Sequence, residues 1–173
     1  MHTKSYIKIV IRINAIIIAC FILIFVFNNS TNRFKSIHPY STLQPVNVYK
    51  QEQPLTIDKN LISSDYLLIA YMSTDCDHCD YMMEQLCKNI DSFKQCRVVL
   101  VAQGSKASLE TFSQKHQLNN FKEVLLLHDK DLEMIKKYKI SSTPHFLMYN
   151  KEGKNILTIK GETKIENLLK PLQ

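Results

Sequence analysis

The chain has 173 residues, with 22 Lys and Arg against 16 Asp and Glu, and a formal net charge of +6. This length allows one ordinary domain with an appendage. Five of the basic residues and none of the acidic ones lie in the first 35 positions, so the excess charge is not the basic stripe of a nucleic-acid-binding protein. With three glycines and no GxGxxG motif, the sequence also excludes the glycine-rich loops that hold nucleotide phosphates.

A long apolar run occupies residues 7–27 and is interrupted only by Lys8, Arg12 and Asn14, all near its start. About 20 apolar residues in a helix span the ~30 Å hydrocarbon core of a bilayer. Positive charge is denser at the start of the run than after it, which predicts a cytoplasmic N-terminus. We therefore expect residues 1–28 to be a single-pass transmembrane signal anchor in the cell membrane. The globular part would then be periplasmic or otherwise extracytoplasmic.

Two other interpretations of this segment stay open. Residues 17–20, Ile-Ile-Ala-Cys, resemble a lipobox that would attach a lipid at Cys20, although the apolar run continues for seven residues beyond it. A cleaved signal peptide would need a site of small residues, whereas the residues after Phe27 are Asn, Asn, Ser, Thr and Asn. The uncleaved anchor is therefore the favoured interpretation.

The rest of the chain divides into a proline-interrupted stretch and a regular one. Residues 29–63 contain three prolines and predict a linker and lead-in, with a short edge strand at 46–49. Residues 64–173 alternate apolar runs with amphipathic segments, which predicts an α/β domain with a central mixed sheet and helices on both faces. We expect strands at 66–72, 97–102, 123–127, 145–149 and 155–159, and helices at 77–90, 105–116, 129–138 and 163–169.

Cys76 and Cys79 are separated by two residues at the junction of the first of these strands and the first helix. Unpaired N–H groups and the positive end of the helix dipole favour a thiolate at a helix start, and the thiolate is the nucleophile of disulfide exchange. A CxxC pair can instead be half of a zinc site, but no second CxxC occurs. The favoured interpretation is a redox dithiol that needs no metal and no other cofactor.

The residues around the pair predict opposing effects on the dithiol. His78 lies between the two cysteines and, as a cation, would stabilise a Cys76 thiolate and make the oxidised pair a better oxidant. Asp75 and Asp77 oppose this, because nearby negative charge disfavours a thiolate. The alternative for His78 is a solvated loop histidine.

Cys87 and Cys96 lie nine positions apart, late in the first expected helix and just before the second strand. Outside the cytoplasm a structural disulfide between them is plausible, and it would tie the helix end to the strand start. The alternatives are two buried free thiols or a second pair of resolving cysteines.

Three features together resemble the thioredoxin superfamily: Cys76-x-x-Cys79 after an apolar strand, Thr143-Pro144 before a later strand, and a Lys-Glu-Gly-Lys hairpin at 151–154. The segment 121–154 is similar to the TlpA/ResA-type membrane-anchored branch and its peroxiredoxin relatives. The resemblance covers about residues 64–170.

The resemblance implies a thioredoxin-like fold and a separate role for each residue of the site. Cys76 would attack, Cys79 would resolve the mixed disulfide, Pro144 would be cis, and the Thr143 backbone would face Cys76 and pair with an incoming peptide. Such a thiol-disulfide oxidoreductase would act on disulfides of exported proteins, more as a reductase than as an oxidase. A membrane partner would donate or accept the electrons.

The sequence departs from the family at three places. Asp75 replaces the usual Trp, Asp77-His78 replaces the usual Gly-Pro pair, and Ala70 stands where thioredoxins often carry a buried acid.

Two other functions are considered. The first is a thiol peroxidase of peroxiredoxin type, because Ser73 lies three residues before Cys76, as a Thr does in that family. The second is a non-catalytic copper carrier resembling Sco proteins, which would use Cys76, Cys79 and His145.

Overall fold

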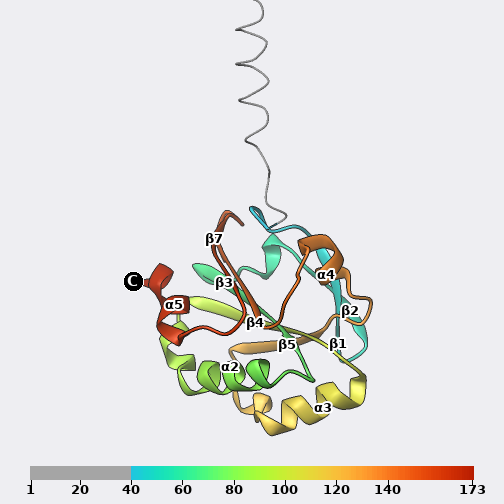
Figure 1. The fold of residues 1–173 in the computed structure, drawn as a ribbon. Helices are drawn as coiled ribbons and strands as arrows, with labels where there is room; N and C mark the ends of the chain where they lie inside the picture. The colour runs from blue at the N-terminus through green and yellow to red at the C-terminus, as the bar shows by residue number, and fades with distance from the viewer. Residues whose placement is uncertain (1–39) are drawn as a thin grey trace, which may run out of the picture. The chain divides into compact units, whose positions relative to one another are not determined.

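The computed structural model describes residues 40–173 (Figure 1). The predicted anchor at 1–28, and the lipid attachment considered at Cys20, lie outside the described residues. Among residues 40–173, no helix has the length and apolar character needed to cross a membrane.

A seven-stranded mixed sheet runs through the described part of the chain, with the strand order β2-β1-β5-β4-β3-β6-β7. The central strands β3, β4 and β5 are parallel, whereas β6, β7, β1 and β2 each run antiparallel to the neighbour they join. The predicted mixed sheet is therefore confirmed. The strands are β1 Val46–Lys50, β2 Gln53–Ile57, β3 Tyr66–Ser73, β4 Cys96–Gln103, β5 Val124–His128, β6 His145–Asn150 and β7 Asn155–Lys160.

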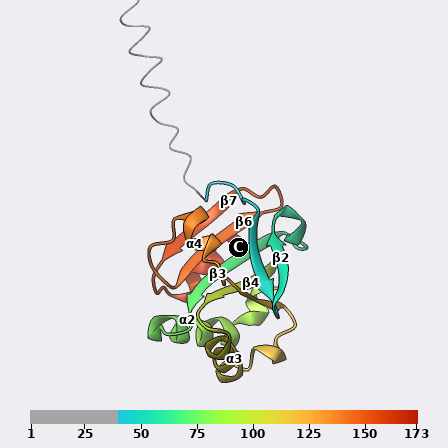
Figure 2. The same ribbon diagram turned by 90° about the vertical axis from the view of Figure 1, so that its right-hand side faces the viewer.

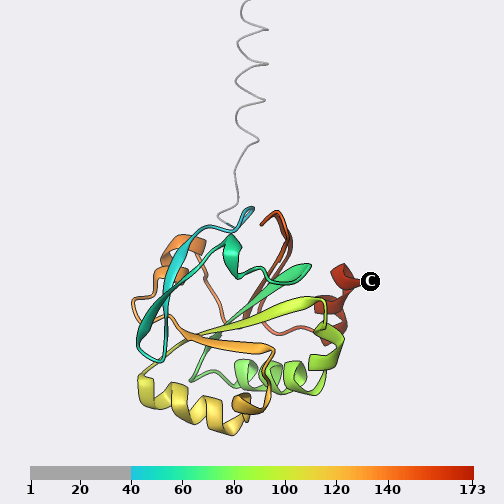
Figure 3. The same cartoon turned by 180° about the vertical axis from the view of Figure 1, so that it is seen from behind.

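Helices cover both faces of this sheet, as the sequence predicted. Figures 1 and 3 show α2 and α3 together on one side, and core contacts add α5 to that side and place α4 on the other. The α-helices are α2 Asp77–Lys88, α3 Lys106–Lys115, α4 Glu133–Tyr138 and α5 Ile165–Leu169, and short 3₁₀ turns occupy Lys59–Leu61, Ile90–Phe93, Leu118–Asn120 and Lys170–Leu172.

Strand β3 is the centre of the fold because its side chains are buried on both faces. Leu68 and Met72 pack with Met83 of α2, whereas Ile69 packs on the opposite face with Tyr138 of α4. Side chains alternate between faces along a strand, which explains why a continuous apolar run was needed here. Each fully buried side chain of this kind contributes roughly 1.5–3 kcal/mol, so β3 is held rigidly in place.

The second half of residues 29–63, expected as a lead-in with one short edge strand, contributes two strands to the sheet. Strands β1 and β2 form a hairpin of the same sheet (Figure 2), and Val48 and Ile57 are fully buried. The expected edge strand is β1, but it lies between β2 and β5, and β2 is the edge. Pro54 indicated a loop in the sequence, yet an edge strand tolerates its missing N–H.

The helix expected at 129–138 begins four residues later than predicted. Both carboxylate oxygens of Asp129 accept a hydrogen bond from the Met134 N–H, at 3.3 and 3.2 Å. Asp129 thus caps the first turn of α4 although it lies before the helix in the chain. Leu132 adopts a left-handed conformation with φ of 55°. Its side chain is 40% exposed instead of packing inward.

Replacing Ile57 by Ala tests whether the β1–β2 hairpin belongs to the folded unit. Because Ile57 is fully buried, we expect a loss of about 2–5 kcal/mol in the free energy of unfolding. Chemical denaturation followed by circular dichroism measures it. The exposed neighbour Gln53→Ala is the matched control and should change stability by less than about 0.5 kcal/mol. Equal effects of the two substitutions would show that the hairpin is a passive linker.

Candidate active site

Cys76 is the N-cap of α2 and joins that helix to the end of β3. Its Sγ accepts a hydrogen bond from the Cys79 N–H at 3.3 Å, and its carbonyl accepts the Cys79 and Asp80 N–H groups. The sulfur thus takes the place that Ser, Asp or Asn oxygens take at most helix starts. Helix starts favour anions in general, and the partly exposed side chain of Cys76 is open to a reaction partner.

Cys79 has the opposite environment one turn further along. Its side chain is fully buried, and its Sγ accepts the Ser73 N–H at 3.5 Å. Burial, followed by its hydrogen bond with Cys76, raises the pKa of the Cys79 thiol to about 12. Cys79 is therefore protonated at neutral pH, which suits a thiol that reacts only after Cys76 has done so. Both cysteines are free in the structure.

The Thr143-Pro144 loop faces this pair from the start of β6. The peptide bond between the two residues is cis, as the resemblance implied. The Thr143 carbonyl lies 3.8 Å from the Cys76 Sγ and accepts its thiol hydrogen. The predicted placement of the Thr143 backbone against Cys76 is therefore present, although the two residues are 67 positions apart.

His78 is exposed, as expected for a solvated loop histidine, but its side chain has a partner. Its Nδ1 lies 2.6 Å from Oε2 of Glu162, in the loop between β7 and α5. This contact joins positions 84 residues apart, and nothing in the local sequence indicated it. Asp75 and Asp77 are exposed beside the pair, so the tuning effect predicted for these three residues remains a prediction.

Asp80, the next acid along α2, is bound by residues from the end of α3. Lys115 Nζ lies 2.7 Å from one carboxylate oxygen, and His116 Nε2 lies 2.8 Å from the other. Burial alone would raise the pKa of Asp80, but these hydrogen bonds outweigh it and the net pKa is lowered. Asp80 therefore fastens α2 to α3 behind the cysteine pair.

Cys87 and Cys96 are not bonded to each other in the structure, so the suggested structural disulfide is not present. The Cys87 thiol donates to the His116 carbonyl at 3.9 Å, and the Cys96 thiol donates to the Arg97 carbonyl at 3.7 Å. Burial raises the pKa of Cys87 to about 11 and that of Cys96 to about 12. The alternative of two free, largely buried thiols is the one that the structure adopts.

Comparisons with known proteins identify the family to which the chain belongs. A family model described as a thioredoxin-like domain matches residues 54–173. The chain belongs to that family. No curated protein matches the chain significantly.

Solved structures with the same fold include several oxidoreductases. A secreted Mycobacterium tuberculosis disulfide oxidoreductase, described as homologous to Escherichia coli DsbE, aligns with a TM-score of 0.60 and 14% identity, over 78% of this chain and 96% of its own. StoA from Bacillus subtilis aligns with a TM-score of 0.60 and 16% identity, over 77% of this chain and 99% of its own. The thioredoxin domain of a Bacteroides vulgatus thiol-disulfide oxidoreductase aligns with a TM-score of 0.60 and 17% identity, over 77% of this chain and 94% of its own. At such low identity these likenesses show a shared fold.

The thioredoxin-like domain does not bring His145 to the cysteines. Phe146 and Met148 of β6 pack in the same core cluster as Cys79, whereas Leu147 belongs to the cluster on the opposite face. Alternation along β6 therefore places His145 on the face away from Cys79. The copper site considered from Cys76, Cys79 and His145 is not assembled, and residues 40–173 hold no group of three His, Cys, Asp or Glu arranged for a metal.

A buried acid that sequence analysis missed lies on the same far face. Asp129 is 1% exposed and accepts a hydrogen bond from the Tyr71 hydroxyl at 2.9 Å. Burial raises the pKa of Asp129. Because Tyr71 and Ala70 alternate between faces, this acid does not replace the one absent at Ala70 beneath Cys79.

The rate of thiol alkylation should differ between the two active-site cysteines. Because burial raises the pKa of the Cys79 thiol, very little of it is thiolate at pH 8, and its alkylation rate should rise as the pH is raised. We expect iodoacetamide to modify Cys76 at least ~100-fold faster in the reduced protein. Peptide mass spectrometry measures the alkylation rates of Cys76 and Cys79, with buried Cys96 as the internal reference. Equal rates at Cys76 and Cys79 would contradict the assigned roles.

Proposed function

We propose that the protein is a thiol-disulfide oxidoreductase in which Cys76 attacks and Cys79 resolves. The observation that carries the proposal is the contrast between two sulfurs one helical turn apart. Cys76 is accessible at a helix N-terminus and faces the Thr143 carbonyl, whereas Cys79 is buried and held as a neutral thiol. Membership of the thioredoxin-like family supports it.

The chemistry balances over two exchange steps. The Cys76 thiolate attacks one sulfur of a substrate disulfide, so a Cys76–substrate disulfide forms, the substrate bond breaks, and the released sulfur takes a proton. Cys79 then gives up its proton and attacks the Cys76 sulfur, which forms the Cys76–Cys79 disulfide and releases the second substrate thiol. Two electrons pass from the protein to the substrate, and a partner dithiol returns them.

The Thr143-Pro144 loop would hold the substrate chain during the first step. The Thr143 carbonyl lies at the attacking sulfur, so a peptide that hydrogen-bonds along this backbone would place its own disulfide at Cys76. Recognition through backbone groups makes few demands on substrate side chains, which suits a protein that acts on several substrates.

For cellular setting, we propose an extracytoplasmic domain of the TlpA/ResA type, anchored through residues 1–28. The apolar run at 7–27 supports this. One neighbour in fold is described as secreted, and another from Streptococcus pneumoniae as an exposed lipoprotein. Exported proteins would be the substrates and a membrane electron donor the partner. A midpoint potential of about −250 mV or lower would support the reductase direction, and about −120 mV the oxidase direction.

A peroxidase receives no support from the site. The Ser73 N–H points to Cys79 and not to Cys76. The sequence has no Arg after Arg97, and Arg97 pairs with Leu67 at the far end of β3 from the cysteines.

Replacing Cys79 by Ser should trap the mixed disulfide. Without the resolving thiol, Cys76 stays bonded to its substrates, so we expect disulfide-linked adducts of the expressed full chain that a reductant releases. Non-reducing electrophoresis and mass spectrometry measure them and map the bond to Cys76. Cys76→Ser is the matched control and should give none. Adducts of equal amount in the two variants, or none from folded Cys79→Ser protein, would contradict the proposal.

A further inference from the structure

The outer edge of β5 is open over most of its length. On one side β5 pairs with β4 along the whole strand, from Val124 to His128. On the other side β1 pairs with it at a single position, Tyr49 opposite His128. Within residues 40–173, the stretch 124–127 therefore has no strand on its outer side.

The backbone of Leu126 faces this open edge. The Asp129 N–H donates to the Ala102 carbonyl in β4, and N–H and C=O groups alternate in direction along a strand. Leu126 and His128 therefore direct their amide and carbonyl groups away from β4, and His128 uses that direction to meet β1. The same groups of Leu126 are left for a partner.

A groove of about 650 Å³ runs along this edge, between β5, α3 and the β1–β2 hairpin. This volume lies within the roughly 300–1,000 Å³ typical of ligand sites. Its floor includes the half-buried side chains of Val124, Leu126 and Phe121, and Leu109 of α3 lines one wall. An extended chain could therefore place alternate apolar side chains in the groove while its backbone pairs with β5.

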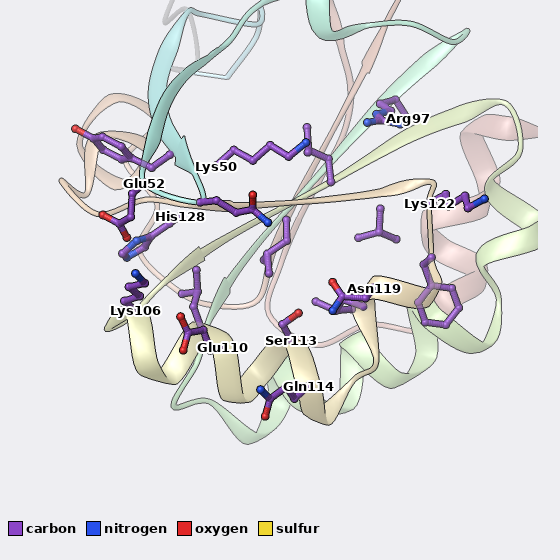
Figure 4. A pocket seen from close by; sticks show the side chains of 18 residues that line it. Lys50, Glu52, Arg97, Lys106, Glu110, Ser113, Gln114, Asn119, Lys122 and His128 are labelled. Atoms are coloured by element: carbon purple, nitrogen blue, oxygen red, sulfur yellow. The ribbon is translucent and has the colours of Figure 1, made fainter.

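Basic side chains surround the groove. Figure 4 shows Lys50, Arg97, Lys106 and Lys122 spread around its length. Two acids, Glu52 and Glu110, also line it, but Glu52 lies 3.8 Å from Lys130 outside the groove. The surplus is positive, so the charge of the groove favours a negatively charged occupant.

The chain's own N-terminal segment does not fit that charge. Residues 1–35 contain five basic residues and no acidic one, so the segment would bring positive charge to a positive groove. This favours an occupant from another protein.

We propose that the groove binds an extended, acidic segment of a partner protein, which adds as a strand to the outer edge of β5. Strand addition to an open edge is a common mode of peptide recognition. The site is separate from the cysteines, because β5 lies two strands away from β3 in the sheet. A partner held there leaves Cys76 accessible, and the proposal does not depend on the redox chemistry of the protein.

A peptide of alternating Glu and Val, labelled with fluorescein, tests the proposal against the full chain in neutral detergent. Fluorescence anisotropy should show saturable binding, and the same peptide with Lys in place of Glu should bind at least about tenfold more weakly. The double variant Lys106→Glu/Lys122→Glu should weaken binding of the acidic peptide by a similar factor. Lys164→Glu/Lys170→Glu is the matched control, because both residues are exposed and lie outside the groove, and it should retain binding.

Hydrogen exchange measured by mass spectrometry distinguishes strand addition from surface adhesion. The bound acidic peptide should slow exchange in the segment that contains Leu126, because its N–H gains a partner. Absence of binding would mean that the basic residues only protect an exposed edge from aggregation, and the proposal would be wrong. Equal binding of both peptides, equal loss in the control variant, or unchanged exchange in β5 would also overturn it.

Discussion

The cysteine pair depends on one hydrogen bond, from the Cys79 N–H to the Cys76 sulfur at the first turn of α2. It makes a cysteine the cap of a helix, so a backbone amide holds the sulfur that starts the exchange at one fixed place. The bond exists because β3 is buried on both faces and delivers the chain to the helix start at a fixed place. Asp80 then fastens α2 to α3 through Lys115 and His116. The packing of β3 and the contacts of Asp80 thus fix the position of the Cys76 sulfur.

The second constraint is the antiparallel pairing of β6 with β3. Tyr71 lies opposite His145, so the Thr143-Pro144 loop that precedes β6 meets the end of β3, from which the cysteine segment departs. One sheet register therefore brings together a nucleophile, its resolving partner and a backbone that can hold a substrate chain. On the other side of β3 and β4, β1 meets β5 at a single pair and leaves a groove beside it.

The local pattern of the sequence was enough to predict much of this arrangement. The apolar runs located β3 to β7, because burial depends on the pattern of neighbouring residues. Ser105 caps α3 by accepting the Ser108 N–H, and such a residue marks a helix start in the sequence. Pairings between distant residues could not be read in this way: Glu162 reaches His78 across 84 positions, and nine-residue spacing did not decide whether Cys87 and Cys96 bond. The β2 strand was missed because Pro54 breaks most strands and is tolerated only at an edge, which the sequence alone does not identify.

Equilibration of the full chain with glutathione buffers, followed by acid quenching and peptide mapping, shows whether Cys76 and Cys79 form a redox pair. We expect one disulfide, between Cys76 and Cys79. Its ratio of oxidised to reduced protein should change tenfold for each ~30 mV, as a two-electron couple requires. Cys87 and Cys96 should stay reduced over the same range. If Cys76 and Cys79 each form only separate adducts with glutathione, or stay reduced in strongly oxidising buffers, the two sulfurs are not a redox pair and the proposed exchange chemistry is wrong.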